Sequence, residues 1–338
     1  MKAPLPRIVI VGAGFAGLAA ARALRHTDAD VVLIDRRNHH IFQPLLYQVA
    51  AAILSPADIA APIRRLEVKQ SNLSVVLADV TGVSLADRTV DASILDVRVR
   101  KIAFGFLVVA TGMRPSYFGH DEFARYAPSL KRLNDAEMIR GRILRAFEQA
   151  ATTEDENERA RLMTFVLVGA GPTGVELAAS LARMVSVTLR GNFRRIDPSK
   201  ASILLLDAGN RILPSFAESL SRKVAGRLTK LGVKVVTGVK VETVDEQGVV
   251  AGGTQVPSAT VLRTAGVTAS PIPQMLGTKT DRAGRALVGP FLNVADAPGV
   301  FVIGDAASIT QDEHPLLGVA QAAIQEGWYV ERLIAEQL

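Results

Sequence analysis

Two glycine-rich turns constrain the fold of this 338-residue chain more than any other feature. The first is Gly12-Ala13-Gly14-Phe15-Ala16-Gly17, and the second, about half a chain later, is Gly169-Ala170-Gly171-Pro172-Thr173-Gly174. Each follows a short apolar run, at residues 8–11 and 165–168, and opens a helix-like stretch. A Gly-x-Gly-x-x-Gly turn between a strand and a helix is typical of a dinucleotide-binding unit. The chain is therefore predicted to be an α/β protein with two Rossmann-like, three-layer units.

The three glycines of each turn have separate physical roles. The first permits the tight strand-to-helix turn, the second lets the backbone approach a pyrophosphate, and the third lets the helix pack closely on the strand. The pyrophosphate would then lie on free amides at the positive end of the helix dipole. Asp35 follows the first turn and Asp207 the second, where an acid can bind ribose hydroxyls. Glycine-rich turns also serve packing, but two turns that are each followed by an acid favour binding.

Composition excludes several classes of protein. A chain with 49% hydrophobic and 21% charged residues is an ordinary folded protein, long enough for two domains. The net charge of +6 is spread along the chain, which favours a solvated surface and leaves attraction to an anionic membrane as the alternative. No motif indicates nucleic acid as a partner. Two dinucleotides bound by one chain suggest electron transfer between them. The count of 0 cysteines excludes a redox-active cysteine pair as the acceptor, so the electron acceptor must come from outside the polypeptide.

Targeting and metal signals are absent from the sequence. No run of 18 uncharged apolar residues exists, so no membrane-spanning helix is expected. The glycines and Arg22 make residues 2–24 a strand, turn and helix rather than a signal peptide, which places the catalytic body in the cytoplasm. His39-His40 lacks further ligands at a suitable spacing, so we expect a structural role for this pair and no metal site.

The order of elements repeats along the chain: glycine turn, acid, strand meander, buried strand and small-residue turn. The first copy ends at Thr111-Gly112 and the second at Ala265-Gly266. We predict one domain from residues 1–112 and 283–338, a helical connector at 113–162, and a second domain at 163–282 inserted in the first. Within these parts we expect a meander over 73–100, a helix near Pro56, and a connector helix capped by Asn134. The expected apolar stripe of that connector helix consists of Met138, Ile139, Ile143, Leu144 and Phe147.

Longer segments resemble the type II NADH dehydrogenases, which are single-subunit, non-proton-pumping NADH:quinone oxidoreductases of the two-dinucleotide-binding flavoprotein family. The resemblance covers essentially the whole chain and is carried by residues 38–50 (NHHIFQPLLYQVA), 116–119 (SYFG), 171–176 (GPTGVE), 193–197 (FRRID) and 320–325 (AQAAIQ). The last segment matches the family's quinone-site pattern Ala-Gln-x-Ala-x-Gln. Family members usually continue into amphipathic helices that hold the membrane, whereas this sequence stops at Leu338, so we expect it to lack that anchoring region.

The resemblance implies that the first domain binds FAD tightly and without a covalent bond. Asp35 would bind the adenosine ribose, Val80 would meet the adenine through its backbone, and Asp305 would bind the ribityl chain. The residues expected to contact FAD are Gly12, Gly14, Phe15, Ala16, Gly17, Asp35, Arg36, Val80, Ala110, Thr111, Gly112, Gly304, Asp305, Ala320 and Gln321.

The resemblance also implies that the second domain binds NADH as a co-substrate. Asp207 favours NADH over NADPH because a 2′-phosphate would face a carboxylate, although Arg211 nearby weakens that inference. The residues expected to contact NADH are Gly169, Gly171, Pro172, Thr173, Gly174, Glu176, Asp207, Ala265 and Gly266.

Three residues are candidates for a catalytic role. Glu176 lies within two turns of the second glycine turn, where the family places a glutamate near flavin and nicotinamide; the alternative is a favourable charge at a helix N-terminus. Gln321 and Gln325 are four apart and share a helix face, which could line a quinone pocket or be an ordinary polar face.

The family usually has an aromatic residue in place of Arg263, so we expect altered packing near the nicotinamide.

The main hypothesis is transfer of hydride from nicotinamide C4 to flavin N5, followed by two electrons to ubiquinone or menaquinone. One alternative is the same first half-reaction feeding a small soluble redox protein. Another is a flavin-binding module without turnover. The sequence leaves open peripheral contact with the inner face of the cell membrane and the formation of a homodimer.

Overall fold

The computed structural model describes residues 5–94, 97–311 and 314–338. Contacts divide the chain into two compact units. Unit 1 comprises Met1–His40, Ala60–Arg114 and Val267–Leu338, and unit 2 comprises Ile41–Ile59 and Pro115–Gly266. Most of the predicted connector and the segment Ile41–Ile59 therefore group with the second glycine turn. The predicted boundaries of the two cofactor domains stay a prediction.

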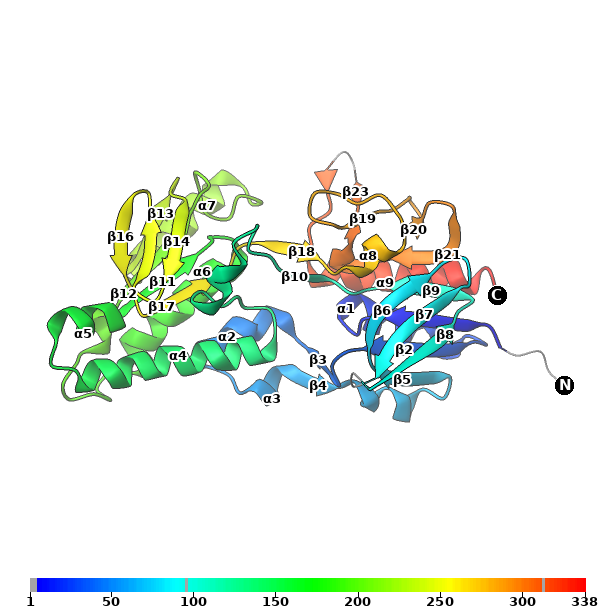
Figure 1. Ribbon diagram of the computed structural model, residues 1–338, viewed down its shortest axis with the longest axis horizontal. Coiled ribbons are helices and arrows are strands. Elements are labelled where there is room, and N and C mark those ends of the chain that lie inside the picture. Colours follow the sequence, from blue (N-terminus) through cyan, green and yellow to red (C-terminus); the bar gives the residue numbers. More distant parts are fainter. Residues whose placement is uncertain (1–4, 95–96, 312–313) are drawn as a thin grey trace. The chain divides into compact units, whose positions relative to one another are not determined.

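Unit 1 is built on a six-stranded sheet in the order β20-β21-β9-β1-β2-β5 (Figure 1). Its strands are β1 Arg7–Val11, β2 Asp30–Asp35, β5 Leu73–Leu77, β9 Phe106–Val109, β20 Asn293–Val294 and β21 Ala297–Val302. Neighbouring strands are parallel, except that β20 runs antiparallel to β21 at one edge. The prediction that a meander begins at Leu73 is wrong, because β5 extends the parallel ladder with Leu73 opposite Val31.

Alternate residues of β1 enter two different cores, as the two-residue period of a strand requires. Ile8 and Ile10 pack under helices α1 (Phe15–Ala23) and α9 (Ala320–Ala335). Val9 and Val11 pack under the antiparallel meander of β6 (Asp79–Ser84), β7 (Thr89–Ile94) and β8 (Arg98–Ala103). A Cβ on Gly327 of α9 would lie 2.6 Å from the Ala16 carbonyl oxygen, so this glycine permits the close packing of α9 on α1.

Unit 2 has the same three layers as unit 1: helices, a central sheet and an antiparallel meander. Its sheet is parallel, in the order β13-β12-β11-β17 (Figure 1). Its strands are β11 Thr164–Val168, β12 Ser202–Asp207, β13 Val233–Thr237 and β17 Thr260–Arg263. Phe165 and Leu167 pack under α2 (Leu46–Ala50), α4 (Leu133–Thr152), α6 (Pro172–Arg183) and α7 (Glu218–Lys230). Val166 packs on the other face, under the meander of β14 (Val241–Asp245), β15 (Gly248–Ala251) and β16 (Thr254–Pro257).

Three local predictions were wrong or incomplete. Helix α4 begins at Leu133 with Arg132 as its N-cap, and the Asp135 carboxylate accepts hydrogen bonds from the Arg132 and Lys131 amides at 2.8 and 3.0 Å. Asn134 is therefore inside the helix. Met138 is 43% exposed and is not part of the buried stripe. The helix near Pro56 is only α3, Pro56–Ile59, because the chain then turns into the short strand β4.

Short elements complete the described chain. The strands are β3 His39–Ile41, β4 Ala60–Pro62, β10 Met113–Pro115, β18 Val267–Ala269, β19 Ala286–Leu287, β22 Ala307–Ser308, β23 Thr310–Gln311 and β24 His314–Pro315. The helices are α5 Glu156–Leu162, α8 Ile272–Met275, η1 Leu24–His26, η2 Gln43–Leu45, η3 Ile63–Arg65, η4 Glu67–Lys69, η5 Asp121–Arg125, η6 Met184–Thr188, η7 Pro198–Lys200 and η8 Gly304–Ala306. Within the described ranges, no helix is both long enough and apolar enough to cross a bilayer.

Candidate functional site

The first glycine turn joins β1 to α1 at the carboxyl end of the unit 1 sheet. Gly12 has a φ of +105°, and a Cβ there would lie 2.4 Å from the Ala110 carbonyl oxygen. A Cβ on Gly17 would lie 1.8 Å from the Gly12 carbonyl oxygen. Gly14 differs, because none of the described atoms outside its own neighbours lies within 4 Å of its Cβ position. The outer glycines are required by the fold, and the middle one leaves room for a pyrophosphate.

Asp35 ends β2 and fixes the conformation of this turn. Its Oδ2 accepts a hydrogen bond from the Ala13 amide at 2.7 Å, and its Oδ1 accepts one from the Arg37 amide at 2.8 Å. The Arg37 guanidinium adds a longer contact, with Nε 3.7 Å from Oδ1. The carboxylate that the sequence assigns to a ribose therefore lies against the glycine turn, where a ribose contact would be close to the pyrophosphate.

Two more turns of unit 1 lie at the same edge of the sheet. Thr111-Gly112 follows β9 and Gly304-Asp305 follows β21, and β1, β9 and β21 are neighbouring parallel strands. Gly112 and Gly304 have φ values of +61° and +65°. Since the carboxyl ends of parallel strands meet at one edge, the structure brings Gly12, Thr111 and Asp305 together. In the strand order the chain leaves β1 to opposite sides, and such a switch point is where open α/β sheets bind ligands.

The other residues expected to contact FAD differ in their position in unit 1 and in their burial. Phe15 and Ala16 lie in the first turn of α1, Ala320 opens α9, and Val80 is buried on β6. Arg36 is exposed directly after β2. The sequence predicted a structural role for His40 without a named partner. In the structure His40 Nδ1 lies 3.0 Å from the Ala13 carbonyl oxygen, and the His40 ring contacts the Phe15 ring edge to face.

The second glycine turn has nearly the same geometry in unit 2. Gly169 has a φ of +111°, and its Cβ would lie 2.3 Å from the Ala265 Cβ. A Cβ on Gly174 would lie 1.9 Å from the Gly169 carbonyl oxygen. Gly171 again has an open Cβ position among the described atoms. The Thr264 hydroxyl donates to the Gly169 carbonyl at 2.7 Å and so joins this turn to the end of β17.

Asp207 repeats the arrangement of Asp35. Its Oδ2 accepts from the Ala170 amide at 2.6 Å and its Oδ1 from the Gly209 amide at 2.7 Å. Arg211, which could have received a 2′-phosphate, donates instead to the carbonyls of Phe216 and Pro214 at 2.7 and 2.6 Å. These bonds engage the guanidinium of Arg211 within its own loop.

Comparison with known proteins identifies the family of this chain. The family model described as pyridine nucleotide-disulphide oxidoreductase matches residues 6–327. The chain belongs to this family. It has no cysteine, so the disulphide chemistry in the family's description cannot be performed by this chain.

Individual relatives show which members of the family this chain resembles. The type II NADH:quinone oxidoreductase Ndh of Mycobacterium tuberculosis (strain ATCC 25618 / H37Rv) is 44% identical over 98% of this chain and 73% of its own length. The mitochondrial internal alternative NAD(P)H-ubiquinone oxidoreductase A1 of Arabidopsis thaliana is 30% identical over 97% of this chain and 66% of its own length. A solved structure of NDH2 from Plasmodium falciparum in complex with NADH matches with a TM-score of 0.87 at 20% identity, over 97% of this chain and 83% of that one. These findings confirm the expected two-dinucleotide-domain fold and the predicted resemblance.

Glu176 is the fifth residue of α6, counted from Pro172. The first turn of this helix contains no acid, and its N-cap, Gly171, provides no side-chain hydrogen bond. The carboxyl of Glu176 reaches the surface, yet partial burial raises its pKa above the usual value. A protonatable group near the carboxyl edge of the second sheet suits a role in orienting a ligand or holding a proton.

Gln321 and Gln325 are both exposed on the first turns of α9, whereas Ala323 and Val330 on the opposite side are buried. Sequence reasoning missed Trp328, the single tryptophan of the chain, which is 54% exposed and lies three residues after Gln325 on the same helix face. Leu317 and Val319, just before the helix, are also exposed. An apolar surface beside two amides suits an amphipathic ring compound such as a quinone.

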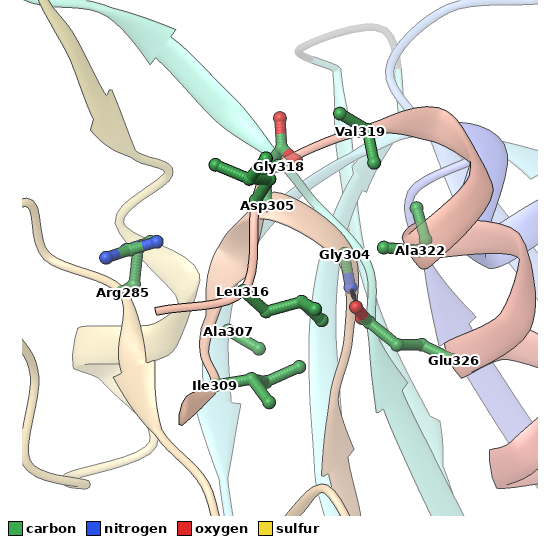
Figure 2. A pocket seen from close by; sticks show the side chains of 12 residues that line it. Arg285, Gly304, Asp305, Ala307, Ile309, Leu316, Gly318, Val319, Ala322 and Glu326 are labelled. Carbon is green, nitrogen blue, oxygen red and sulfur yellow. Dashed lines mark hydrogen bonds between the residues drawn. The ribbon is translucent and has the colours of Figure 1, made fainter. Parts of the chain in front are cut away.

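Glu326 is a second residue that sequence reasoning missed (Figure 2). Figure 2 shows its side chain pointing from α9 to Gly304, where Oε2 accepts the amide hydrogen bond at 2.5 Å. Burial raises the pKa of Glu326, the Gly304 amide opposes that shift, and the nearby Asp305 carboxylate adds to it. Glu326 thus links the helix of the glutamines to the turn that contains Asp305. The signal was an acid on a helix face that is otherwise apolar.

Arg263 ends β17 beside Gly266, whose φ is +85° and whose Cβ would lie 2.8 Å from Arg263 Nη2. The guanidinium carbon lies 5.0 Å from the Tyr117 ring centre and 5.6 Å from that of Phe118. Its Nε is buried without a hydrogen-bond partner among the described residues, and burial lowers its pKa. A cation between two rings thus occupies the place where an aromatic side chain was expected.

Proposed function

We propose that this protein is a type II NADH:quinone oxidoreductase that transfers two electrons from NADH to a quinone through non-covalently bound FAD. The observation that supports it best is the pair of glycine turns, each open at its middle glycine and each held by an acid. This pair occurs in a chain that aligns over 98% of its length with a type II NADH:quinone oxidoreductase.

Unit 1 is the proposed FAD site. Gly12, Gly14 and Gly17 would receive the pyrophosphate, Asp35 the ribose, and Asp305 the ribityl chain. The open position at Gly14 is the part of this structure that fits the group, since a side chain there would occupy the space a pyrophosphate needs. When bound, FAD supplies the two-electron chemistry that no side chain of this chain can supply.

Unit 2 is the proposed NADH site. Gly169, Gly171 and Gly174 would receive the pyrophosphate, and Asp207 would bind the adenosine ribose. Asp207 also repels a 2′-phosphate, and Arg211 is already engaged by loop carbonyls. Glu176 would orient the nicotinamide or hold a proton, which suits a carboxyl whose pKa is raised by burial.

Helix α9 is the proposed quinone surface. Gln321 and Gln325 would donate hydrogen bonds to quinone oxygens, and Trp328 would pack on the ring or its tail. Both amides are exposed, and none of the described residues is hydrogen-bonded to their side chains, so their donors are available. We propose that the enzyme lies in the cytoplasm as a peripheral protein on the inner face of the cell membrane, and that it forms a homodimer.

Steady-state oxidation of NADH by the purified flavoprotein tests this function. We expect turnover with a short-chain ubiquinone or menaquinone, and little with a small soluble redox protein such as a ferredoxin. The reverse preference would favour the reductase alternative. Turnover with neither acceptor would favour a module without catalysis.

Glu176→Gln tests the proposed role of the carboxyl. We expect a fall in kcat of about tenfold or more, as removal of an acid–base group causes. Glu218→Gln is the matched control, because Glu218 also lies at the start of a helix of unit 2 but is far along the chain from the glycine turn. Full turnover of Glu176→Gln with both substrates would remove Glu176 from the mechanism.

A further inference from the structure

A cavity of about 520 Å³ lies in unit 1 between the later turns of α1 and the short helices η3 and η4. Its volume is within the range of about 300–1,000 Å³ that is typical of ligand pockets. It shares no residue with the proposed FAD, NADH or quinone contacts. The residues that line it are Leu18, Arg22, Arg25, His40, Ala61, Pro62, Ile63, Arg65, Leu66, Val68, Lys69 and Gln70.

The charge around this cavity is of one sign. Arg22, Arg25, Arg65 and Lys69 line it, and none of the lining residues is acidic. Within the part of the chain that the structure describes, no carboxylate forms a salt bridge with any of these four. The acid that is close in sequence, Glu67, is directed elsewhere: it pairs with Arg64 at 2.8 Å and accepts the Val75 amide at 2.6 Å. The four cations therefore produce a positive potential that no lining carboxylate offsets.

The same cavity has apolar walls and an apolar rim. Leu18 and Ile63, which line it, are buried. Val68 is 87% exposed between Arg65 and Lys69, and Pro62 is exposed at the other end of η3. An exposed aliphatic residue flanked by cations is typical of a segment that enters a lipid interface while its charges meet the head groups.

We propose that this cavity binds the head group of an anionic phospholipid in a membrane surface, with Val68 and Pro62 entering the interface. A phosphodiester provides the negative charge that the four cations lack, and the glyceryl and first acyl carbons match the apolar walls. A soluble anion would match the charge but would leave the exposed valine and proline without a partner. Clusters of cations near a surface helix are how proteins recognise anionic leaflets.

This inference deepens the proposed function, since an enzyme that reduces a membrane quinone must reach the bilayer. His40 connects the two, because it lines the cavity and its Nδ1 contacts the Ala13 carbonyl of the first glycine turn. Burial lowers the pKa of His40, so this histidine carries less positive charge near neutral pH than a free histidine would. Binding to lipid should therefore depend on salt more strongly than on pH near neutrality.

The test is co-sedimentation of the purified holoenzyme with vesicles of phosphatidylcholine, with and without phosphatidylglycerol. We compare the wild type with the triple variant Arg22→Gln/Arg65→Gln/Lys69→Gln. Each cation near an anionic surface contributes about fivefold to the affinity, so the triple variant should bind the anionic vesicles about a hundredfold more weakly. The matched control is Arg98→Gln/Arg100→Gln/Lys101→Gln on β8, which also removes three exposed positive charges from unit 1. It should retain most of the binding.

Two further measurements separate the sources of binding. Val68→Asp should weaken binding to anionic vesicles about tenfold or more, and a large excess of glycerol phosphate should not displace the wild type. Equal losses in the two triple variants, equal binding to neutral vesicles, no vesicle binding at all, or displacement by glycerol phosphate would each overturn the proposal. Turnover with a soluble quinone should be unchanged in Arg22→Gln/Arg65→Gln/Lys69→Gln, so failure of the lipid site is distinguishable from failure of the proposed function.

Discussion

The two glycine turns share one backbone geometry, but the neighbouring strand ends in an apolar residue in unit 1 and in a charged residue in unit 2. The first glycines have φ values of +105° and +111°, and each turn is held by an aspartate that accepts a turn amide. In unit 1 the residue opposite Val11 is Val109, which is fully buried. In unit 2 the residue opposite Val168 is Arg263. The turn is thus set by backbone geometry that permits little change, whereas the neighbouring strand end can hold an apolar or a charged side chain.

The two units also differ in how a carboxyl group is placed near the site. In unit 1, Glu326 is buried and bonded to the Gly304 amide. In unit 2, Glu176 reaches the surface, with no such bond among the described residues. A buried, bonded carboxyl suits a site that holds its cofactor permanently, and a carboxyl at the surface suits a ligand that exchanges in each turnover.

The largest effect on stability is expected from replacing the third glycine of either turn by alanine. Gly17→Ala and Gly174→Ala each place a Cβ within 2 Å of a backbone carbonyl, at 1.8 and 1.9 Å, and the backbone must move. We expect each to lower the free energy of unfolding by about 3 kcal/mol or more. Chemical denaturation and flavin absorbance measure the outcome. Gly17→Ala should lose flavin, and Gly174→Ala should retain flavin but lose NADH binding.

Gly141→Ala is the matched control for these two variants. Gly141 lies in α4 with an open Cβ position, so alanine should stabilise the protein by up to about 1 kcal/mol. If Gly17→Ala and Gly174→Ala unfolded like Gly141→Ala, the outer glycines would not be required by the turns.

The second effect comes from exchanging the two strand ends. Val109→Arg buries a guanidinium in a fully apolar place and should cost about 3 kcal/mol or more. Arg263→Trp removes a half-buried cation and places an aromatic ring beside Tyr117 and Phe118, so it should raise the free energy of unfolding by about 1 kcal/mol. Urea denaturation of both variants provides the measurement. A large destabilisation by Arg263→Trp would mean that the charge itself is needed at this place.

The third effect concerns the two acids. Asp207→Asn keeps an oxygen for the Ala170 amide but removes the charge that repels a 2′-phosphate. The ratio of kcat/KM for NADPH to that for NADH should rise about tenfold. Asp35→Asn is the counterpart in unit 1 and should leave this ratio unchanged while weakening flavin retention. A change of the ratio in Asp35→Asn alone would reverse the assignment of the two units.

The smallest effect is a pH dependence specific to unit 1. Burial raises the pKa of Glu326, so its contribution to stability is present at low pH and is lost as the pH rises through that raised pKa. Glu326→Gln cannot titrate. Its free energy of unfolding, relative to the wild type, should therefore increase as the pH rises from acidic to neutral. Denaturation at several pH values measures this difference, and parallel pH profiles of the two proteins would refute it.

The sequence predicted the parts of the fold that depend on local pattern. The apolar runs at residues 8–11 and 165–168 lie in β1 (Arg7–Val11) and β11 (Thr164–Val168), because a continuous apolar run that ends at a turn has few alternatives. Helix α7 was missed because most of its residues are polar or charged, so its few apolar positions lie in a hydrophilic stretch that is also typical of a loop. Asn134 was preferred to the true cap because the capping carboxylate, Asp135, lies inside the helix and reaches back to amides before it.

The site was predictable where a motif fixes the backbone and not where the tertiary fold selects partners. Gly14 and Gly171 were recognised from spacing alone. Arg211 was expected to weaken the preference for NADH, since the sequence could not show that loop carbonyls engage its guanidinium. Glu326 needed the three-dimensional pairing of α9 with the Gly304 turn, which are 22 residues apart.

In the proposed mechanism unit 1 holds a flavin, unit 2 binds NADH, and a quinone removes the electrons. Anaerobic spectroscopy of the purified protein tests all three parts in sequence. We predict that NADH bleaches the flavin absorption, that NADPH does so far more slowly, and that added quinone restores the colour. A flavin that stays oxidised in excess NADH, or a reduced flavin that quinone fails to reoxidise, would contradict the account.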